Sequence, residues 1–235
     1  MKDKKMNPVI SIIVPIHIFP KKIKEVRNSI LKATTPIEII YVADKKVSDF
    51  IENIKINEKI IKKENKGRGY MFAKGVSISN GEIILFLHSD TILPIGWDKK
   101  IRNLLEDKIV IGGGFLLKFD VESVYLNFFL KIFNFRSKKS KIMTGDRAIF
   151  VRSSLIKNNL STIEIPIMED IELSYLMKKN GKIVIINDYV ITSADAFITK
   201  GALRHTLKAV KCFLWYRLGG NLENIFNSYY SKQKY

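Results

Sequence analysis

The sequence of 235 residues contains a single cysteine, Cys212, and this scarcity limits the kinds of site that it can build. One cysteine cannot form an internal disulfide, and zinc sites made of several cysteines are excluded. Internal repeats and low-complexity linkers are also lacking. Because so little cysteine suits a reducing compartment, we expect a cytoplasmic protein.

Long apolar runs are missing as well, since none approaches the roughly 18 residues that a membrane-spanning helix needs. The N-terminus places Lys2, Lys4 and Lys5 before an apolar run, as a signal peptide does. However, Pro15 interrupts that run and no small-residue cleavage site follows. We therefore predict that Val9–Ile16 is the first strand of a folded domain.

Acidic residues are outnumbered, with 23 Asp and Glu against 40 Lys and Arg, so the net charge is +17. A basic surface attracts nucleic acid, anionic lipid or phosphorylated substrates. The sequence has no zinc-finger spacing, Walker motif or aromatic RNA-binding signature. We therefore expect no nucleic-acid partner, and anionic lipid and phosphorylated substrates remain.

The most informative segment is GEIILFLHSD, from Gly81 to Asp90. A short apolar run after a glycine turn indicates a strand buried on both faces, as in parallel α/β sheets. Ligands of such sheets bind beyond the carboxyl ends of the strands. Asp90 falls at that end, so it either meets a metal or phosphate, or caps the next segment.

Strand and helix patterns alternate along the chain. Strands are expected over 9–16, 37–43, 60–61, 83–88 and 182–186, and helices over 21–34, 47–56, 69–79, 121–135, 171–179 and 201–218. This alternation predicts βαβ units, and hence an α/β fold with a parallel sheet.

Acidic residues follow several of these strands or lie in loops. They are Asp44, Asp90, Asp146 and the pair Glu169–Asp170. If they converge on one sheet edge, they can hold Mg²⁺ or Mn²⁺ against a phosphate, and a further carboxylate can serve as a general base. The alternative for Glu169 and Asp170 is that they stabilise the N-terminus of a helix.

Three basic or titratable residues have different expected roles. Arg68 lies in a glycine-containing loop before a helix, where it either contacts phosphate or is simply solvated. His17 ends the first strand and could touch a nucleotide. His88 is expected to be packed rather than to bind a ligand.

The helix patterns at 121–135 and 201–218 suggest contact with lipid. The first is rich in aromatic residues, and the second is basic and amphipathic. Such helices either lie on an anionic membrane or pack on the domain with a solvated basic side. In 201–218 the shared apolar face is formed by Leu203, Leu207, Val210, Leu214 and Leu218, beside Arg204, Lys208 and Lys211.

Several segments, in their order along the chain, resemble family 2 glycosyltransferases. They are SIIVPIH at 11–17, the strand ending at Asp44, GRGYMFAKG at 67–75, FLHSDTILPIGW at 86–97, GGFLLKFD at 113–120, NFRSK at 134–138, GDRAIFVR at 145–152 and IPIMEDIELS at 165–174. The resemblance covers roughly 8–218 and is greatest to the group associated with radical-SAM/selenodomain gene neighbourhoods.

The resemblance implies a GT-A fold, a single α/β domain with a mixed, mainly parallel central sheet. It implies an inverting enzyme that moves a sugar from a nucleotide-diphosphate donor to an acceptor hydroxyl. We assign residues 1–200 to this domain and 201–235 to a helical extension, packed on the domain or on a membrane surface.

The resemblance also assigns roles to residues. Asp170, with Glu169 beside it, matches the general base, and Asp90 matches the ligand of a catalytic Mg²⁺ or Mn²⁺. The positions that match nucleotide-sugar binding are Pro15, His17, Asp44, Arg68, Ser89, Gly145 and Asp146.

The sequence departs from the family pattern at Asp195-Ala196-Phe197, which replaces an Arg-Arg-Trp-like segment. This loss leaves a second hypothesis open, a catalytically impaired transferase fold that binds a membrane or a protein. The aromatic segment at 121–135 and the basic C-terminus favour a lipid-linked acceptor and a peripheral position on the inner face of the membrane.

Overall fold

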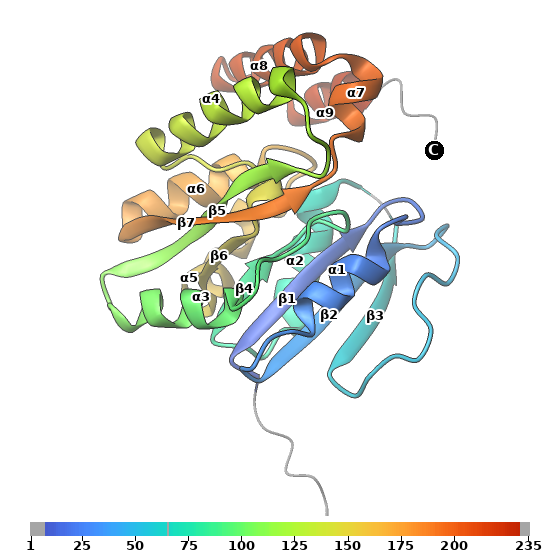
Figure 1. Ribbon diagram of the computed structural model, residues 1–235, viewed down its shortest axis with the longest axis vertical. Coiled ribbons are helices and arrows are strands. Elements are labelled where there is room, and N and C mark those ends of the chain that lie inside the picture. Colours follow the sequence, from blue (N-terminus) through green and yellow to red (C-terminus); the bar gives the residue numbers. More distant parts are fainter. Residues whose placement is uncertain (1–7, 65, 231–235) are drawn as a thin grey trace, which may run out of the picture.

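The computed structural model describes residues 8–64 and 66–230 (Figure 1). Lys2, Lys4 and Lys5 lie outside the described residues. In the part of the chain that is described, no helix is long and apolar enough to cross a membrane.

A seven-stranded sheet forms the centre, in the order β3-β2-β1-β4-β6-β5-β7 (Figure 1). Its strands are β1 (Ile10–Ile16), β2 (Ile37–Asp44), β3 (Glu58–Lys63), β4 (Ile83–Phe86), β5 (Val110–Phe119), β6 (Ile149–Arg152) and β7 (Lys182–Thr192). β6 pairs antiparallel with β4 and β5, and the other pairings are parallel. The predicted mixed, mainly parallel sheet is thus confirmed.

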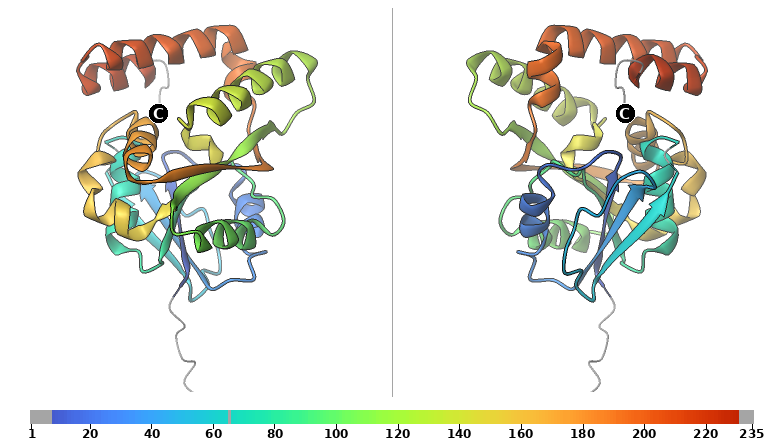
Figure 2. Two further views of the ribbon diagram at one scale, coloured as in Figure 1. Left: turned by 90° about the vertical axis from the view of Figure 1, so that its left-hand side faces the viewer. Right: turned by 90° about the vertical axis from the view of Figure 1, so that its right-hand side faces the viewer.

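Helices cover both faces of the sheet (Figure 2). α1 and α3 pack on one face, and α2, α5 and α6 pack on the other. Because both faces are covered, β1 is buried along its whole length, which explains its continuous apolar sequence. These helices are α1 (Ile23–Ile30), α2 (Arg68–Ile78), α3 (Trp97–Glu106), α5 (Ser153–Asn158) and α6 (Glu169–Asn180).

A second group of helices gathers at one end of the molecule, beyond β5 and β7 (Figures 1 and 2). It consists of α4 (Val124–Ser140), α7 (Asp195–Lys200), α8 (Ala202–Arg217) and α9 (Leu222–Tyr230). Cys212 of α8 and Ile225 of α9 pack with Ile167, which lies two residues before the start of α6. The division into a domain at 1–200 and an extension at 201–235 stays a prediction.

The expected helix over 47–56 is wrong, because this stretch is a loop. Its apolar residues have helical spacing, yet Val47 and Phe50 are buried from a loop. Phe50 packs edge-on against Tyr41 of β2, with ring centroids 5.9 Å apart. Asn53 has a positive φ of 52°, which a continuous helix does not allow.

The ends of two predicted strands differ from the expected residues, and some elements were not predicted at all. β4 ends at Phe86, so His88 lies in the following loop and not in the strand. β7 extends to Thr192, well past the expected end at 186. Six elements were not predicted from the sequence, namely α3, β5, β6, α5, α7 and α9.

A buried ion pair connects the helix α1 to the edge strand β3. Arg27 donates from Nε and Nη2 to the two carboxylate oxygens of Glu58, at 2.7 and 2.6 Å. The Glu58 side chain is fully buried. Burial alone would raise the pKa of Glu58, but the bonds from Arg27 and the Lys55 amide lower it.

We therefore expect Glu58→Gln to lower the free energy of unfolding by about 3 kcal/mol, because Arg27 loses its buried partner. The matched control is Asp188→Asn, which removes an exposed ion pair with Lys100 and should cost less than about 1 kcal/mol. Urea unfolding at neutral pH measures both values.

The pH dependence gives a second readout of the same pair. Because folding lowers the pKa of Glu58, its contribution is present at neutral pH and is lost as the pH falls through the folded-state pKa. The gap between wild type and Glu58→Gln should therefore shrink in acid. A gap that stays constant with pH would contradict the ion-pair explanation.

Candidate active site

Four segments that are distant in sequence meet around the side chain of Arg68. They are the start of α2, the loop after β4, the 3₁₀ turn η1 (Gly145–Arg147) and the start of α6. The loop after β4 lies at the carboxyl edge of the parallel strands. The sequence predicted a site at this edge.

Glycines on both sides of Arg68 allow α2 to begin against the loop that leads into α6. A Cβ atom on Gly69 would lie 2.2 Å from the Ile165 carbonyl oxygen, and one on Gly67 would lie 2.4 Å from that of Pro166. No side chain fits at these distances. Because Gly67 and Gly69 have no side chains, the backbone at Arg68 lies close to the loop before α6, and the Arg68 side chain can reach the acidic residues of α6.

The Arg68 guanidinium contacts three other side chains at once. Its Nε donates to Glu169 Oε1, and its Nη2 donates to Asp170 Oδ2 at 3.2 Å. Its Nη1 lies 2.9 Å from His88 Nε2. Arg68 therefore connects the loop after β4 to the first turn of α6.

Burial of this cluster changes its protonation equilibria. Burial acts to lower the pKa of Arg68, but the negative charges of Glu169 and Asp170 outweigh it and raise the pKa. Burial raises the pKa of Glu169, and the positive charge of Arg68 opposes that effect only in part. The pKa of His88 is well below its usual value because of burial and the charge of Arg68, so its ring is neutral.

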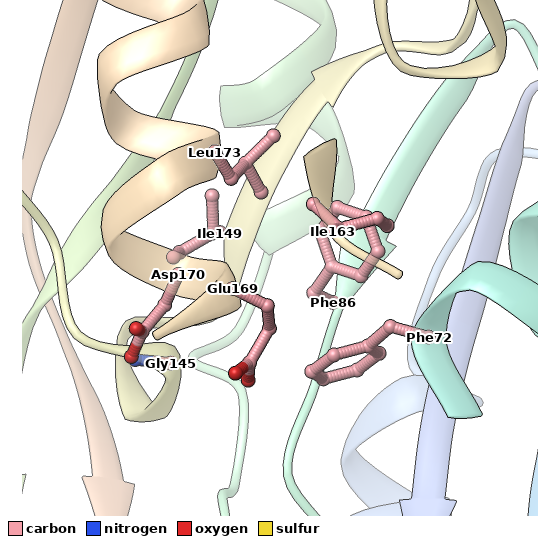
Figure 3. Close-up of a pocket in the computed structure, with 8 residues that line it drawn as sticks. All are labelled: Phe72, Phe86, Gly145, Ile149, Ile163, Glu169, Asp170 and Leu173. Atoms are coloured by element: carbon pink, nitrogen blue, oxygen red, sulfur yellow. The ribbon is translucent and has the colours of Figure 1, made fainter. Parts of the chain in front are cut away.

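The two acidic residues at the start of α6 point in different directions, Asp170 toward Gly145 and Glu169 toward Phe72 (Figure 3), and they differ in accessibility. The Glu169 side chain is 3% exposed and that of Asp170 is 12% exposed. Glu169 Oε2 has no hydrogen-bond partner among the described residues. Asp170 Oδ2 also accepts a hydrogen bond of 2.7 Å from the Gly145 amide. Asp170 is therefore the more accessible carboxylate and the one held on two sides.

A cavity of about 10 Å³ lies between these carboxylates and apolar residues such as Phe72 and Phe86 (Figure 3). This volume is near the minimum for one water molecule, so a sugar does not fit. Gly145 closes another side, because a Cβ there would lie 2.9 Å from His88 Nε2 and 3.1 Å from Arg68 Cζ. A substrate must therefore approach Asp170 from outside this cavity.

Asp90 and Asp146 lie near enough to each other, beside the cluster, for their charges to interact, and we call them the Asp90–Asp146 pair. Burial raises the pKa of Asp90, and the charge of nearby Asp146 raises it further. Thr144 Oγ1 donates to Asp146 Oδ1 at 2.6 Å, which orients that carboxylate. Two neighbouring carboxylates repel each other, and a cation between them would relieve the repulsion.

This pair fits a hard divalent cation only in part. Carboxylate oxygens are the ligands that Mg²⁺ and Mn²⁺ prefer. Over residues 8–64 and 66–230, however, no three His, Cys, Asp or Glu side chains are grouped to hold a metal. Asp90 and Asp146 would thus supply one or two ligands, and a substrate phosphate and water would supply the rest.

The remaining predicted residues lie along the same edge of the sheet. Pro15 is buried within β1, and His17 follows that strand closely enough for its charge to lower the pKa of His88. Asp44 ends β2 and accepts a hydrogen bond of 2.8 Å from the Lys46 amide. Ser89 is half-buried between His88 and Asp90. Asp44 is separated from the loop after β4 by the intervening strand β1.

Three further residues lie near the site and were not predicted from the sequence. Lys22, which pairs with Asp120, lies near enough to Asp90 for its positive charge to lower the pKa of that carboxyl. Tyr229 and Tyr230, at the end of α9, lie near Arg68. No local sequence signal links these positions to the site, because only the tertiary fold brings them there.

Known proteins that are similar in sequence or fold indicate the family of this chain. The model of the family described as Glycosyl transferase family 2 matches residues 11–158, more than half of the chain. No match was found among curated protein sequences.

Solved structures with a similar fold include two transferases. Residues 1–349 of TarS from S. aureus align with a TM-score of 0.62 and 20% identity, covering 96% of this chain and 72% of that one. The mannosyltransferase PcManGT from Pyrobaculum calidifontis, in complex with GDP-Man and Mn²⁺, aligns with a TM-score of 0.65 and 14% identity, covering 97% and 71%. At these identities the likeness concerns the fold. With the match to the family model, the chain belongs to glycosyl transferase family 2, and its fold is the GT-A fold.

Proposed function

We propose that this glycosyltransferase is an inverting enzyme in which Asp170 is the general base. The observation that carries the proposal is the meeting of Asp170, Arg68 and the Asp90–Asp146 pair at the carboxyl edge of the parallel strands. The donor would be a nucleotide-diphospho-sugar. The narrower likeness to the radical-SAM/selenodomain-associated group stays a prediction.

In the proposed reaction, an acceptor hydroxyl attacks the anomeric carbon from the side opposite the diphosphate. The new glycosidic bond forms as the bond between the anomeric carbon and the diphosphate oxygen breaks, so the configuration inverts. The hydroxyl proton passes to Asp170, whose carboxylate is held by Arg68 and by the Gly145 amide. Binding both substrates in one site supplies the proximity that the reaction needs.

Asp90, with Asp146 beside it, would hold Mg²⁺ or Mn²⁺ against the donor diphosphate. When bound, such a cation acts as a Lewis acid for the departing diphosphate. His88 contacts Arg68, so its role in this proposal is to position Arg68 rather than to bind the metal. Lys22 lies near Asp90 and is a further candidate for contact with phosphate.

The donor edge would consist of Pro15, His17, Asp44, Arg68 and Ser89, with Gly145 nearer the sugar. Two structural neighbours support a nucleotide-sugar donor, since TarS was solved with UDP-GlcNAc and PcManGT with GDP-Man. A UDP- or GDP-hexose is therefore the first donor to test here.

For the acceptor, we propose a lipid-linked molecule at the inner face of the membrane, with the protein itself cytoplasmic and peripheral. α9 supports this idea, because it follows the basic helix α8 and brings Tyr229 near the charges of Arg68 and Asp170. The C-terminal helices are thus in a position to influence which acceptor reaches the site.

Replacement of the proposed base should stop transfer without unfolding the protein. We expect Asp170→Asn to lower the turnover of the preferred donor roughly 10³-fold, because an amide cannot take the acceptor proton. The matched control is Glu164→Gln, an exposed acid in the loop before α6, which should keep full activity. Full activity in Asp170→Asn would remove this residue from the base role.

The second hypothesis, a catalytically impaired fold that binds a membrane or a protein, also has an observation in its favour. Arg68 pairs with both Glu169 and Asp170, and the cavity beside them is too small for a sugar. In addition, Phe197, which lies in the segment that departs from the family, packs on Phe119 at 4.9 Å between ring centroids. That position carries no charge for a phosphate.

Calorimetry distinguishes the two hypotheses. If the protein is an active transferase, UDP- or GDP-sugars should bind with Mn²⁺ present, and Asp90→Asn should weaken that binding at least tenfold, or about 1.4 kcal/mol. The control Asp195→Asn, an exposed acid on α7, should bind as wild type does. Absence of nucleotide binding at any metal concentration would favour the impaired fold.

A further inference from the structure

Helices α4 and α8 expose apolar side chains that a folded domain normally buries. The exposed apolar residues are Val124, Tyr125, Phe128, Ile132 and Phe135 on α4, and Leu203, Leu207, Val210, Leu214 and Leu218 at α8. Phe128 is 62% exposed and Leu207 is 59% exposed. Large exposed apolar patches mark contact sites for a partner or a membrane.

The apolar stripe on α8 lies opposite the face that packs. Because each residue turns the helix by about 100°, Leu203, Leu207 and Leu214 share one face, and the buried residues Ala202 and Cys212 lie on the other side. The leucine face is therefore not the one that holds α8 on the protein. The exposure of the leucine face argues against the alternative in which this face of α8 packs on the domain.

Helix α4 has the same organisation. Its buried residues Leu126 and Leu130 face the core, while Phe128 and Phe135 lie on the opposite side. Ser123 caps its N-terminus by accepting a hydrogen bond of 3.3 Å from the Leu126 amide. Thus the N-terminus of α4 is capped, and its exposed aromatic residues face away from the core.

Positive charge accompanies both stripes. α4 and α8 together carry eight lysine and arginine residues and no aspartate or glutamate. None of the eight takes part in an ion pair within the described ranges. Lys138, Lys208 and Arg217 donate hydrogen bonds to Asn187, Tyr229 and Tyr175, so the other five cations are the ones available to an anionic partner.

The two helices line one groove together, and an aromatic contact links α4 to the segment just before α8. Tyr125 of α4 and Leu203 and Arg204 of α8 line an open groove of about 530 Å³. Phe197 of α7 lies beside Phe133 of α4, with ring centroids 6.1 Å apart. We call the exposed apolar and basic residues of α4 and α8, with this groove, the α4–α8 face.

We propose that the α4–α8 face docks on the surface of a membrane that contains anionic lipid. Exposed leucine and phenylalanine side chains would enter the boundary between headgroups and acyl chains, and the flanking cations would contact lipid phosphates. This combination selects lipid over other anionic partners. Nucleic acid binds chiefly through phosphate charge and gains nothing from a leucine stripe, and a second copy of the chain would place eight like charges on each side.

Docking itself needs no transferase chemistry, whereas its use in presenting a lipid-linked acceptor rests on the proposed function. His205 of α8 connects the face to the site. Its ring packs on Phe197, with centroids 4.8 Å apart, and lies 6.3 Å from that of Tyr229. The rings of Phe197, His205 and Tyr229 thus form a chain of contacts from the groove to a residue that lies near Arg68.

Co-sedimentation of the full chain with vesicles tests the proposal. We expect binding to phosphatidylcholine vesicles that contain phosphatidylglycerol, and much weaker binding to phosphatidylcholine alone. Leu207→Glu/Leu214→Glu should weaken binding by about tenfold or more, because charged groups replace the inserted leucines. The control Ile56→Glu changes a residue that is 90% exposed in the loop before β3, and it should bind as wild type does.

Two charge-reversal variants test the contribution of the cations. Lys211→Glu on α8 should weaken binding and reduce its dependence on salt, whereas Lys108→Glu, an exposed lysine beyond α3, should not. Equal binding to neutral and anionic vesicles, or binding that these α8 variants leave unchanged, would overturn the proposal. So would dimerisation that Leu207→Glu/Leu214→Glu abolishes. Since the assay contains no donor sugar, its result is independent of whether transfer occurs.

Discussion

The buried charge of Arg68 is the interaction on which the site depends. Two carboxylates begin α6 side by side, Glu169 buried and Asp170 nearly so, where burial removes their hydration and their negative charges repel each other unless a cation is present. Arg68 neutralises them and also contacts His88, so it fixes the loop after β4 relative to α6. Removal of this side chain would release the two segments that carry the proposed chemistry.

The backbone around Arg68 is built for this contact. Gly67 and Gly69 let α2 begin in contact with the loop at 163–166, and Gly145 lets the third segment close over the guanidinium. Small residues at these positions are therefore part of the electrostatic arrangement. The sheet edge brings the loops of the site together, and the glycines let these backbone segments approach Arg68 closely.

How much could be read from the sequence depended on the range of the interactions. The strands β1, β2 and β4 were predictable because burial on both faces requires continuous apolar runs, and the acids that follow the strands were expected at one sheet edge. The loop at 47–56 was mistaken for a helix because Val47 and Phe50 pack from irregular backbone. The arrival of Tyr229 at the site and the exposure of the leucine face on α8 depend on tertiary packing, which no local pattern encodes.

The C-terminal helices carry part of the exposed face and also bring residues near the site, so binding to a surface and access to Asp170 are physically close. α8 carries the leucine stripe, and α9 carries the tyrosines that lie near Arg68. A change in how these helices sit would therefore alter both the surface and the surroundings of Asp170.

The central claim, that Arg68 and the α6 carboxylates act as one unit, is tested most directly by a double-mutant cycle. Urea unfolding of wild type, Arg68→Gln, Glu169→Gln and the double variant gives the coupling energy between the two side chains. We expect each single variant to be strongly destabilised and the double variant to be less destabilised than their sum, with a coupling of about 2 kcal/mol. Additive effects, within about 0.5 kcal/mol, would contradict the account.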